Sequence, residues 1–276
     1  MLTYDFQQVE EFIAAKSDRD DFQIQVRQRP WARTSPTVAE NSAVAMQVVG
    51  HRVGVYLTDP GHKILLDGTP MTPPATGSPL PGGGTVVDDT SAGQVTVTWP
   101  DGSYVTIGYL GGYLDISVYI AEQHGHLSGL FGNDDGNPNN DLTTRSGTVL
   151  PYPATPAQIY GTFGPSWRIS QAESLFDYDA GQSTTTFTDT TVPTQIITVA
   201  DLPAANRDAA TTTCRNGGVS IEPFLDDRIL DVAITGDSTT VTSALDSQSF
   251  AFPATPTPTP TPTTVTSAPP TPTPTR

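Results

Sequence analysis

The chain has 276 residues and a formal net charge of −16, from 13 Lys and Arg against 29 Asp and Glu. This balance disfavours binding to nucleic acid or to anionic membranes, because both need clustered basic side chains. The single cysteine, Cys214, excludes an intramolecular disulfide and a cysteine-based zinc site. No stretch approaches the roughly 18 apolar residues that a membrane-spanning helix needs, so we expect no membrane span.

Residues 1–182 carry the alternation of apolar and polar side chains that is typical of β-strands. Phe22, Ile24 and Val26 are separated by polar residues, which predicts a strand with one face in the core. Gln25 and Arg27 are then expected on a face open to water. Further strands are predicted at 51–56, 63–66, 95–99, 104–107 and 114–120, with a hairpin turn at 100–103. Many short strands separated by Gly, Pro and Asp turns indicate a mainly β protein, an antiparallel β-sandwich or open barrel.

The C-terminal part reads differently. A Thr- and Ser-rich connecting segment at 183–199 is followed by apolar residues at helical spacing, which predicts a small helical subdomain at 200–248. Residues 249–276 are predicted to be a disordered Pro/Thr-rich tail, because nine Pro and ten Thr fill most of the last 24 positions. We interpret the tail as a spacer or an O-glycosylated stalk; the alternative is a terminus without a role.

The densest chemistry lies in the loop from Asn133 to Asp141, where seven of nine residues carry a side-chain oxygen. Ca²⁺ accepts carboxylate, amide and backbone carbonyl oxygens together. Three aspartates so close in sequence would repel one another unless a cation or ample water lay between them. An EF-hand is excluded, because Gly136 at its sixth position would put Phe131 and Leu142, which cannot ligate, at its first and last. The alternative is a solvated turn built from Asx-turns.

The loop and its flanks resemble a known family. Gly-Leu-Phe-Gly-Asn-Asp-Asp-Gly at 129–136, with Asp141-Leu142 after it, is similar to the Gly-Leu-Cys-Gly-Asn-x-Asp-Gly signature of the von Willebrand factor type D domain. Further similarities lie at 2–7, 163–178 and 229–237, the last two to bacterial surface proteins. Among them Ser166-Trp167-Arg168 is fairly specific, and the others are supporting. The resemblance implies a β-sandwich with a structural calcium in a secreted or cell-surface protein.

Carried over position by position, the resemblance implies five calcium ligands. Asn133, Asp135, Asn140 and Asp141 would bind through side chains and Asn137 through its backbone carbonyl. Asp134 fills a position that the family does not reserve for a ligand.

Three departures from the family pattern stand out. The family's first strand is normally preceded by a motif whose last Asp also reaches the metal, and Met1 lies one residue past the position of that Asp. We therefore expect weakened calcium binding. We also expect that Met1 is an internal start and that the N-terminus is truncated. Phe131 stands where animal domains have a disulfide cysteine, and we expect it to make an apolar core contact. Arg228 stands where bacterial relatives have a second cysteine, so Cys214 is expected to be an unpaired, buried and inert thiol.

Two other groups of residues could carry chemistry. His124 and His126 sit two residues apart, as in some zinc sites, but no third ligand is near in sequence, and a polar pair beside a turn is the favoured interpretation. The acid pairs at 88–89 and 226–227 invite comparison with a glycosidase, yet adjacent acids are usually solvated. The sequence assembles no nucleophile, base and oxyanion hole.

We therefore expect a non-enzymatic, extracellular or cell-surface adhesion or matrix domain with Ca²⁺ as its cofactor. Its partner would be an unknown extracellular protein or glycan. The alternative is the ancillary domain of a secreted hydrolase whose catalytic module is absent, with a role in binding carbohydrate or presenting the enzyme. An exposed tryptophan strip would favour that alternative, and burial of Trp31, Trp99 and Trp167 would count against it.

Overall fold

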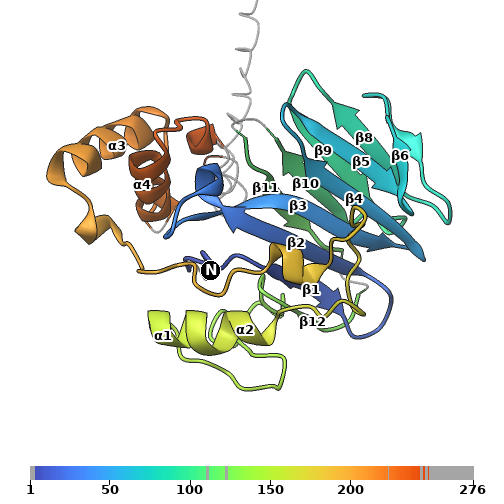
Figure 1. The fold of residues 1–276 in the computed structure, drawn as a ribbon, viewed down its shortest axis with the longest axis horizontal. Coiled ribbons are helices and arrows are strands. Elements are labelled where there is room, and N and C mark those ends of the chain that lie inside the picture. The colour runs from blue at the N-terminus through green and yellow to red at the C-terminus, as the bar shows by residue number, and fades with distance from the viewer. Residues whose placement is uncertain are drawn as a thin grey trace, which may run out of the picture.

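The computed structural model describes residues 4–109, 112–121, 124–222, 224–242, 245 and 248. The tail expected at 249–276 lies outside these residues. Within them, the strands form two antiparallel sheets (Figure 1). The seven-stranded sheet has the order β12-β1-β2-β3-β4-β5-β6, and the five-stranded sheet has the order β11-β10-β9-β8-β7.

The strand bounds follow the alternation of the sequence. In the larger sheet they are β1 (Glu11–Ser17), β2 (Gln23–Pro30), β3 (Ala39–Val48), β4 (His51–Leu57), β5 (His62–Leu66), β6 (Thr69–Met71) and β12 (Leu127–Ser128). In the smaller sheet they are β7 (Ser78–Pro79), β8 (Thr85–Asp89), β9 (Gln94–Thr98), β10 (Tyr104–Gly108) and β11 (Asp115–Tyr119). The expected hairpin is present, since β9 pairs with β10 in a register that sets Thr98 opposite Tyr104.

The two sheets share one apolar core, and this confirms the predicted sandwich. Phe22, Ile24 and Val26 of the larger sheet are buried in the same cluster as the inward residues of β9 and β10. Trp99 joins the layers directly: its ring lies 4.9 Å from the Phe22 ring, and its Nε1 donates to the Gln47 carbonyl at 3.0 Å. Side chains that interdigitate between two sheets are what fix a sandwich of short strands.

The opposite face of β2 is not open to water, so that part of the strand prediction is wrong. Gln25 is 0% exposed and Arg27 is 6% exposed. The chain that follows the strands returns over them: Gln25 Nε2 donates to the Glu173 carbonyl at 2.8 Å, and the Leu175 amide donates to Gln25 Oε1 at 2.8 Å. The sequence of β2 carries no pattern that indicates covering by a segment so distant along the chain.

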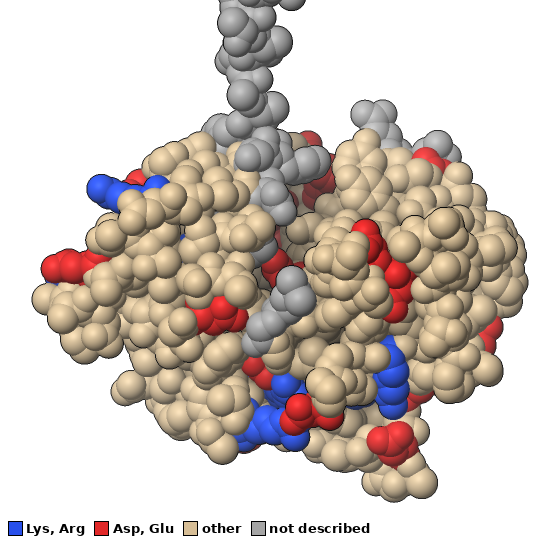
Figure 2. Space-filling view, turned by 90° about the horizontal axis from the view of Figure 1, so that it is seen from above, with Lys and Arg blue, Asp and Glu red and all other residues tan. Residues whose placement is uncertain are grey.

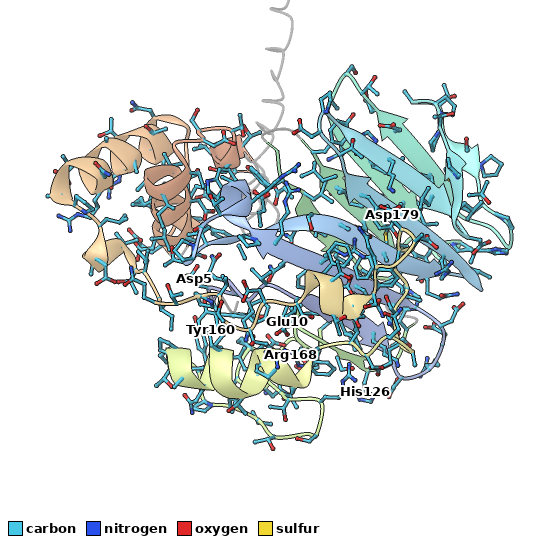
Figure 3. The ribbon with its side chains drawn as sticks, viewed as in Figure 1. Asp5, Glu10, His126, Tyr160, Arg168 and Asp179 are labelled. Atoms are coloured by element: carbon cyan, nitrogen blue, oxygen red, sulfur yellow. The ribbon has the colours of Figure 1, made fainter. Side chains whose placement is uncertain are left out.

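The returning segment begins with one continuous helical stretch made of α1 (Pro156–Gln158), the π-helical turn η2 (Ile159–Phe163) and α2 (Gly164–Ser166). It then runs along the Glu11 end of β1, where the Ile13 amide donates to the Trp167 carbonyl at 2.9 Å. Glu10 is 2% exposed and forms an ion pair with Arg168 at this contact (Figure 3). The stretch at 163–169 is thus part of the β-domain.

The C-terminal helices form a second, smaller unit. They are α3 (Ala204–Asn216) and α4 (Phe224–Thr235), and the short turns of the chain are η1 (Trp31–Arg33), η3 (Thr184–Phe187) and η4 (Val199–Asp201). Cys214, Leu225, Ile229 and Val232 belong to an apolar cluster separate from that of the sandwich. Cys214 is fully buried and burial raises the pKa of its thiol, as expected for an inert cysteine. No helix among the described residues is long and apolar enough to span a bilayer.

Candidate functional site

The acidic loop is held at both ends by the sandwich. At its start the Leu130 amide donates to the Ile13 carbonyl at 3.1 Å and the Phe131 amide to the Ala14 carbonyl at 2.9 Å, both on β1. At its end Leu142 is 1% exposed, and its carbonyl accepts from the Leu150 amide at 2.9 Å. The residues between these anchors therefore project from a rigid base.

The expected core contact of Phe131 is wrong. Its side chain is 51% exposed, whereas Leu130 beside it is 4% exposed and joins the core. Leu130 and Phe131 lie in a turn, in which the Gly132 amide donates to the Gly129 carbonyl at 3.3 Å. Leu130 fills the inward position, which leaves Phe131 in solvent.

A series of Asx-turns shapes the loop. The Asp135 amide donates to Asn133 Oδ1 at 3.2 Å, the Asn137 amide to Asp135 Oδ1 at 2.8 Å, and the Asn139 amide to Asn137 Oδ1 at 3.2 Å. Each side chain thus caps the amide two residues on, a habit of Asn and Asp in turns. The alternation of these residues in the sequence therefore produces a curled loop with its side chains drawn together.

Four of the five expected ligands come together in this curl. Asp135 Oδ2 accepts from Asn133 Nδ2 at 3.3 Å and from Asn140 Nδ2 at 2.7 Å. Asp141 Oδ1 accepts from the Asn133 amide at 3.2 Å. Asn137 differs, because its carbonyl already accepts from the Asn140 amide at 3.3 Å. Asn137 thus joins the network through its backbone and its Asx-turn, and the four residues whose side chains are drawn together are Asn133, Asp135, Asn140 and Asp141.

The electrostatics of the loop reflect the crowding of its acids. Burial, followed by the charges of Asp141 and Asp135, raises the pKa of Asp134. Hydrogen bonds from the Asn140 side chain and the Asn137 amide lower the pKa of Asp135. Asp134, outside the expected ligand set, thus experiences the repulsion, and the Asn residues stabilise the charge of Asp135.

The donor set fits a hard cation by its chemistry. Asn140 Oδ1 is buried and accepts no hydrogen bond, although its Nδ2 is bonded to Asp135. Among the described residues, no three His, Cys, Asp or Glu side chains are grouped closely enough to hold a metal by themselves. A cation here would therefore need the amide oxygens of Asn133 and Asn140 beside the carboxylates, a mixture that Ca²⁺ accepts.

A second polar cluster, which the sequence interpretation missed, surrounds His124. Its Nδ1 lies 2.8 Å from Asp20 Oδ2, and its Nε2 lies 2.8 Å from Asp101 Oδ2 and 3.1 Å from Ser103 Oγ. His126 diverges from it and is an exposed side chain beside Asp18. The two histidines therefore do not share a face, and a zinc site built on both is not formed.

The order Ser103, His124, Asp20 resembles a hydrolase triad, but its surroundings do not support that chemistry. Ser103 is 0% exposed, and its Oγ already accepts from the Ala121 amide at 2.9 Å. Asp101 competes for the same imidazole nitrogen. A nucleophile must meet its substrate and transfer its proton to the base, so this cluster joins the β1–β2 turn to the β9–β10 hairpin instead.

The tryptophans offer no exposed strip. Trp99 and Trp167 are each 4% exposed, and Trp31 is partly buried with its ring 5.9 Å from that of Tyr113. The exposed aromatic pair is instead Tyr104 and Tyr119, whose rings stack with centroids 5.1 Å apart on the outer face of β10 and β11.

Comparison with known proteins gives two findings. The model of the von Willebrand factor type D domain family matches residues 2–148, just over half of the 276 residues. Over 88 residues the chain is 32% identical to Sushi domain-containing protein 2 of Homo sapiens. The aligned region covers 32% of this chain and 11% of that protein. The chain thus matches a small part of the length of that relative.

Proposed function

The chain belongs to the von Willebrand factor type D family, and from this premise we propose that it is a non-enzymatic extracellular adhesion or matrix domain stabilised by calcium. Domains of this family are typical of extracellular and matrix proteins and are generally non-catalytic. The observation that carries the calcium proposal is the convergence of Asn133, Asp135, Asn140 and Asp141 in one anchored loop. An extracellular protein or a glycan would be its partner.

The proposed ligands are the side-chain oxygens of these four residues together with the Asn137 carbonyl. Bound Ca²⁺ would supply positive charge that offsets the repulsion between the aspartates. The start of the loop is hydrogen-bonded to β1, and its end, at Leu142, is buried in the core of the sandwich. Binding would therefore be coupled to folding of the whole β-domain.

We expect calcium to raise the melting temperature of the protein. A ligand that binds only the folded state at 100 times its dissociation constant contributes about 2.7 kcal/mol. For a domain of this size, that free energy corresponds to a rise of about 5–10 °C. The measurement is thermal unfolding followed by circular dichroism, in EGTA and in calcium up to ~10 mM, which covers the affinities of extracellular modules.

The variants Asp135→Asn and Asp141→Asn should abolish most of the calcium-dependent rise. Asp179→Asn is the matched control, since it removes the same charge from an exposed segment between α2 and η3. An equal rise in all three variants, or none in the unmodified protein, would contradict the calcium proposal.

A second candidate function is glycan binding by the outer face of the smaller sheet. Tyr104 and Tyr119 are 36% and 43% exposed and stacked, and aromatic side chains with a polar tip are common at binding surfaces. We expect the double variant Tyr104→Ala/Tyr119→Ala to lose any signal that the unmodified protein gives on a glycan array. A signal that survives in the double variant would argue against this face.

A further inference from the structure

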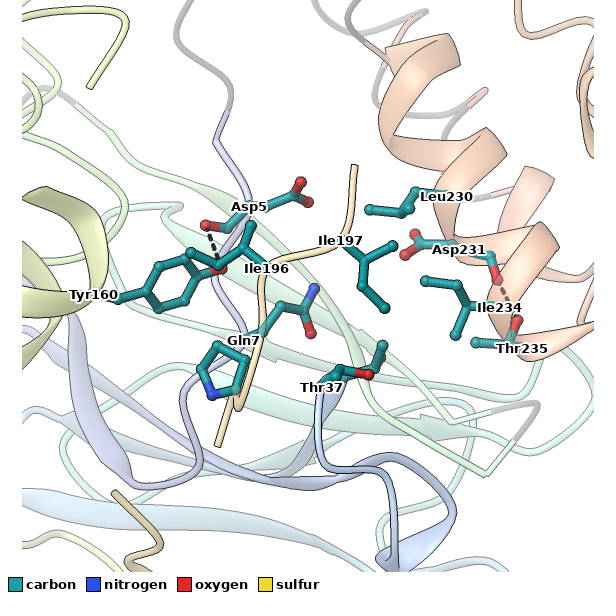
Figure 4. A pocket seen from close by; sticks show the side chains of 12 residues that line it. Asp5, Gln7, Thr37, Tyr160, Ile196, Ile197, Leu230, Asp231, Ile234 and Thr235 are labelled. Atoms are coloured by element: carbon teal, nitrogen blue, oxygen red, sulfur yellow. Dashed lines mark hydrogen bonds between the residues drawn. The ribbon is translucent and has the colours of Figure 1, made fainter. Parts of the chain in front are cut away.

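The sandwich and the C-terminal helices meet across an interface between two separate apolar cores. Along part of it apolar side chains pack closely: Val38 and Ile197 lie with Leu230 and Ile234 of α4 around a cavity of only about 10 Å³, which Asp5 and Asp231 also line. Figure 4 shows Ile197 and Leu230 in the space between the β-domain and α4.

Beside the apolar contact the interface is open and acidic. A cavity of about 270 Å³ is lined by Asp5 of the N-terminal segment, by residues 198–200 and by Asp226 and Asp227 at the start of α4. Red acidic atoms are visible where the helical and β lobes meet in Figure 2. In Figure 4 the carboxylates of Asp5 and Asp231 both point into the space between the units. We call Asp5, Asp227 and Asp231 the acidic interface.

The three carboxyls come from both units and face few compensating charges. Asp227 and Asp231 are four residues apart on α4 and so lie on one side of the helix. Arg228 Nη1 lies 3.1 Å from Asp231 Oδ2. The other charged groups that act on these carboxyls are also acidic: Asp226 on α4 interacts with Asp227, and Asp115 on β11 interacts with Asp231. Docking of α4 therefore concentrates negative charge on both sides of one interface.

We propose that the acidic interface is a proton-operated latch, which holds the helical unit against the sandwich when its carboxyls are protonated and loosens when they ionise. The apolar contact supplies an attraction that does not depend on pH. The carboxyls supply a repulsion that appears only as protons leave.

The direction of the pH dependence follows from the docked state. Burial, then the charges of Asp5 and Asp231, raises the pKa of Asp227 to about 7. Burial also raises the pKa of Asp231 to about 6, although Arg228 opposes the shift, and it raises that of Asp5. In the undocked state these carboxyls would ionise near their usual value of about 4.

The docked state therefore binds more protons than the undocked state between about pH 4 and pH 7, and linkage makes docking stronger as the pH falls through this window. The Asp231 side chain keeps 39% of its surface exposed, so solvent screens part of the effect. We expect the docking equilibrium constant to change on the order of tenfold between pH 5 and pH 8.

Fluorescence transfer between two labelled cysteines tests the latch in the full chain. We would introduce Thr90→Cys in the turn between β8 and β9 and Ala209→Cys on α3, both exposed, in a Cys214→Ala background with EGTA present. Transfer should fall from pH 5 to pH 8, with the helical circular dichroism unchanged. All four histidines lie in the β-domain, and the helical unit contains none.

The double variant Asp227→Asn/Asp231→Asn cannot ionise at the latch and should keep high transfer at pH 8. Asp208→Asn removes one charge from an exposed position of α3 and should behave like the unmodified chain. Transfer that is independent of pH in the unmodified chain, or that falls equally in the double variant, would overturn the proposal. Calcium stabilisation of the acidic loop is measured separately, so neither result decides the other.

Discussion

Replacing Arg27 with Met is expected to lower the free energy of unfolding by about 3–5 kcal/mol, because it leaves a buried carboxylate without its cationic partner. Arg27 Nε donates to Glu11 Oε1 at 2.6 Å, and the Glu11 side chain is 1% exposed. Methionine approximates the volume of the arginine stem but carries no charge. The loss therefore comes mainly from the uncompensated charge of Glu11 rather than from a cavity.

The same variant should also loosen the segment that covers β2. The guanidinium carbon of Arg27 lies 3.5 Å from the ring centroid of Phe187, 4.5 Å from that of Phe176 and 5.2 Å from that of Tyr178. Cations over aromatic faces are attracted by about 0.5–2 kcal/mol, more when they are desolvated. We expect faster hydrogen exchange at 176–187 than in the unmodified protein.

Urea unfolding at pH 7 measures the first effect, with Arg145→Met as the matched control. Arg145 pairs with Glu173 at 2.8 Å, but the two side chains are 35% and 40% exposed. Removal of the Arg145 charge should therefore cost only about 0–1 kcal/mol. The double variant Glu11→Gln/Arg27→Met should recover much of the stability. Equal losses for Arg27→Met and Arg145→Met would refute this account.

The features that the sequence predicted depend on contacts between residues close in sequence, whereas most of the features that it missed depend on contacts between residues far apart in sequence. The alternation of Phe22, Ile24 and Val26 predicted their burial, because the period of a strand is local. The set Asn133, Asp135, Asn140 and Asp141 came from the resemblance to the type D domain, and its members lie within nine residues of one another and are linked by hydrogen bonds. Their role as calcium ligands stays a prediction. Patterns as short as these can be recognised in the sequence without knowledge of the fold.

Apart from the exposure of Phe131, which has a local cause, the errors and omissions depend on distant segments. Arg27 was expected in water, but residues from 173 onwards cover it. His124 was seen beside His126, whereas its partner Asp20 is 104 residues away in sequence. The acidic interface joins Asp5 to α4 across the whole β-domain. Such contacts leave no periodic pattern in the local sequence. The sequence therefore indicated the fold class and the acidic loop, but not the environment of Arg27, the His124 cluster or the acidic interface.

His124→Ala is expected to destabilise the protein by about 2–4 kcal/mol, through loss of ring packing and of the partner that lies between two carboxylates. The His124 ring lies 4.2 Å from that of Phe22. Burial alone would raise the pKa of Asp20, but hydrogen bonds from His124, Ser17 and the Phe22 amide outweigh it and lower that pKa. In the variant the pKa of Asp20 should therefore rise, which carboxyl NMR titration would detect.

His126→Ala is the matched control, because its side chain is 90% exposed two residues away and its loss should change stability by less than about 0.5 kcal/mol. Urea unfolding of both variants at pH 7 gives the comparison, and an ester-hydrolysis assay on the unmodified protein tests the resemblance of Ser103, His124 and Asp20 to a triad. Hydrolysis that disappears in both His124→Ala and Ser103→Ala would refute the structural role. Because Ser103 is 0% exposed and bonded to the Ala121 amide, we expect no turnover. Of the two histidine variants, only His124→Ala should lose stability.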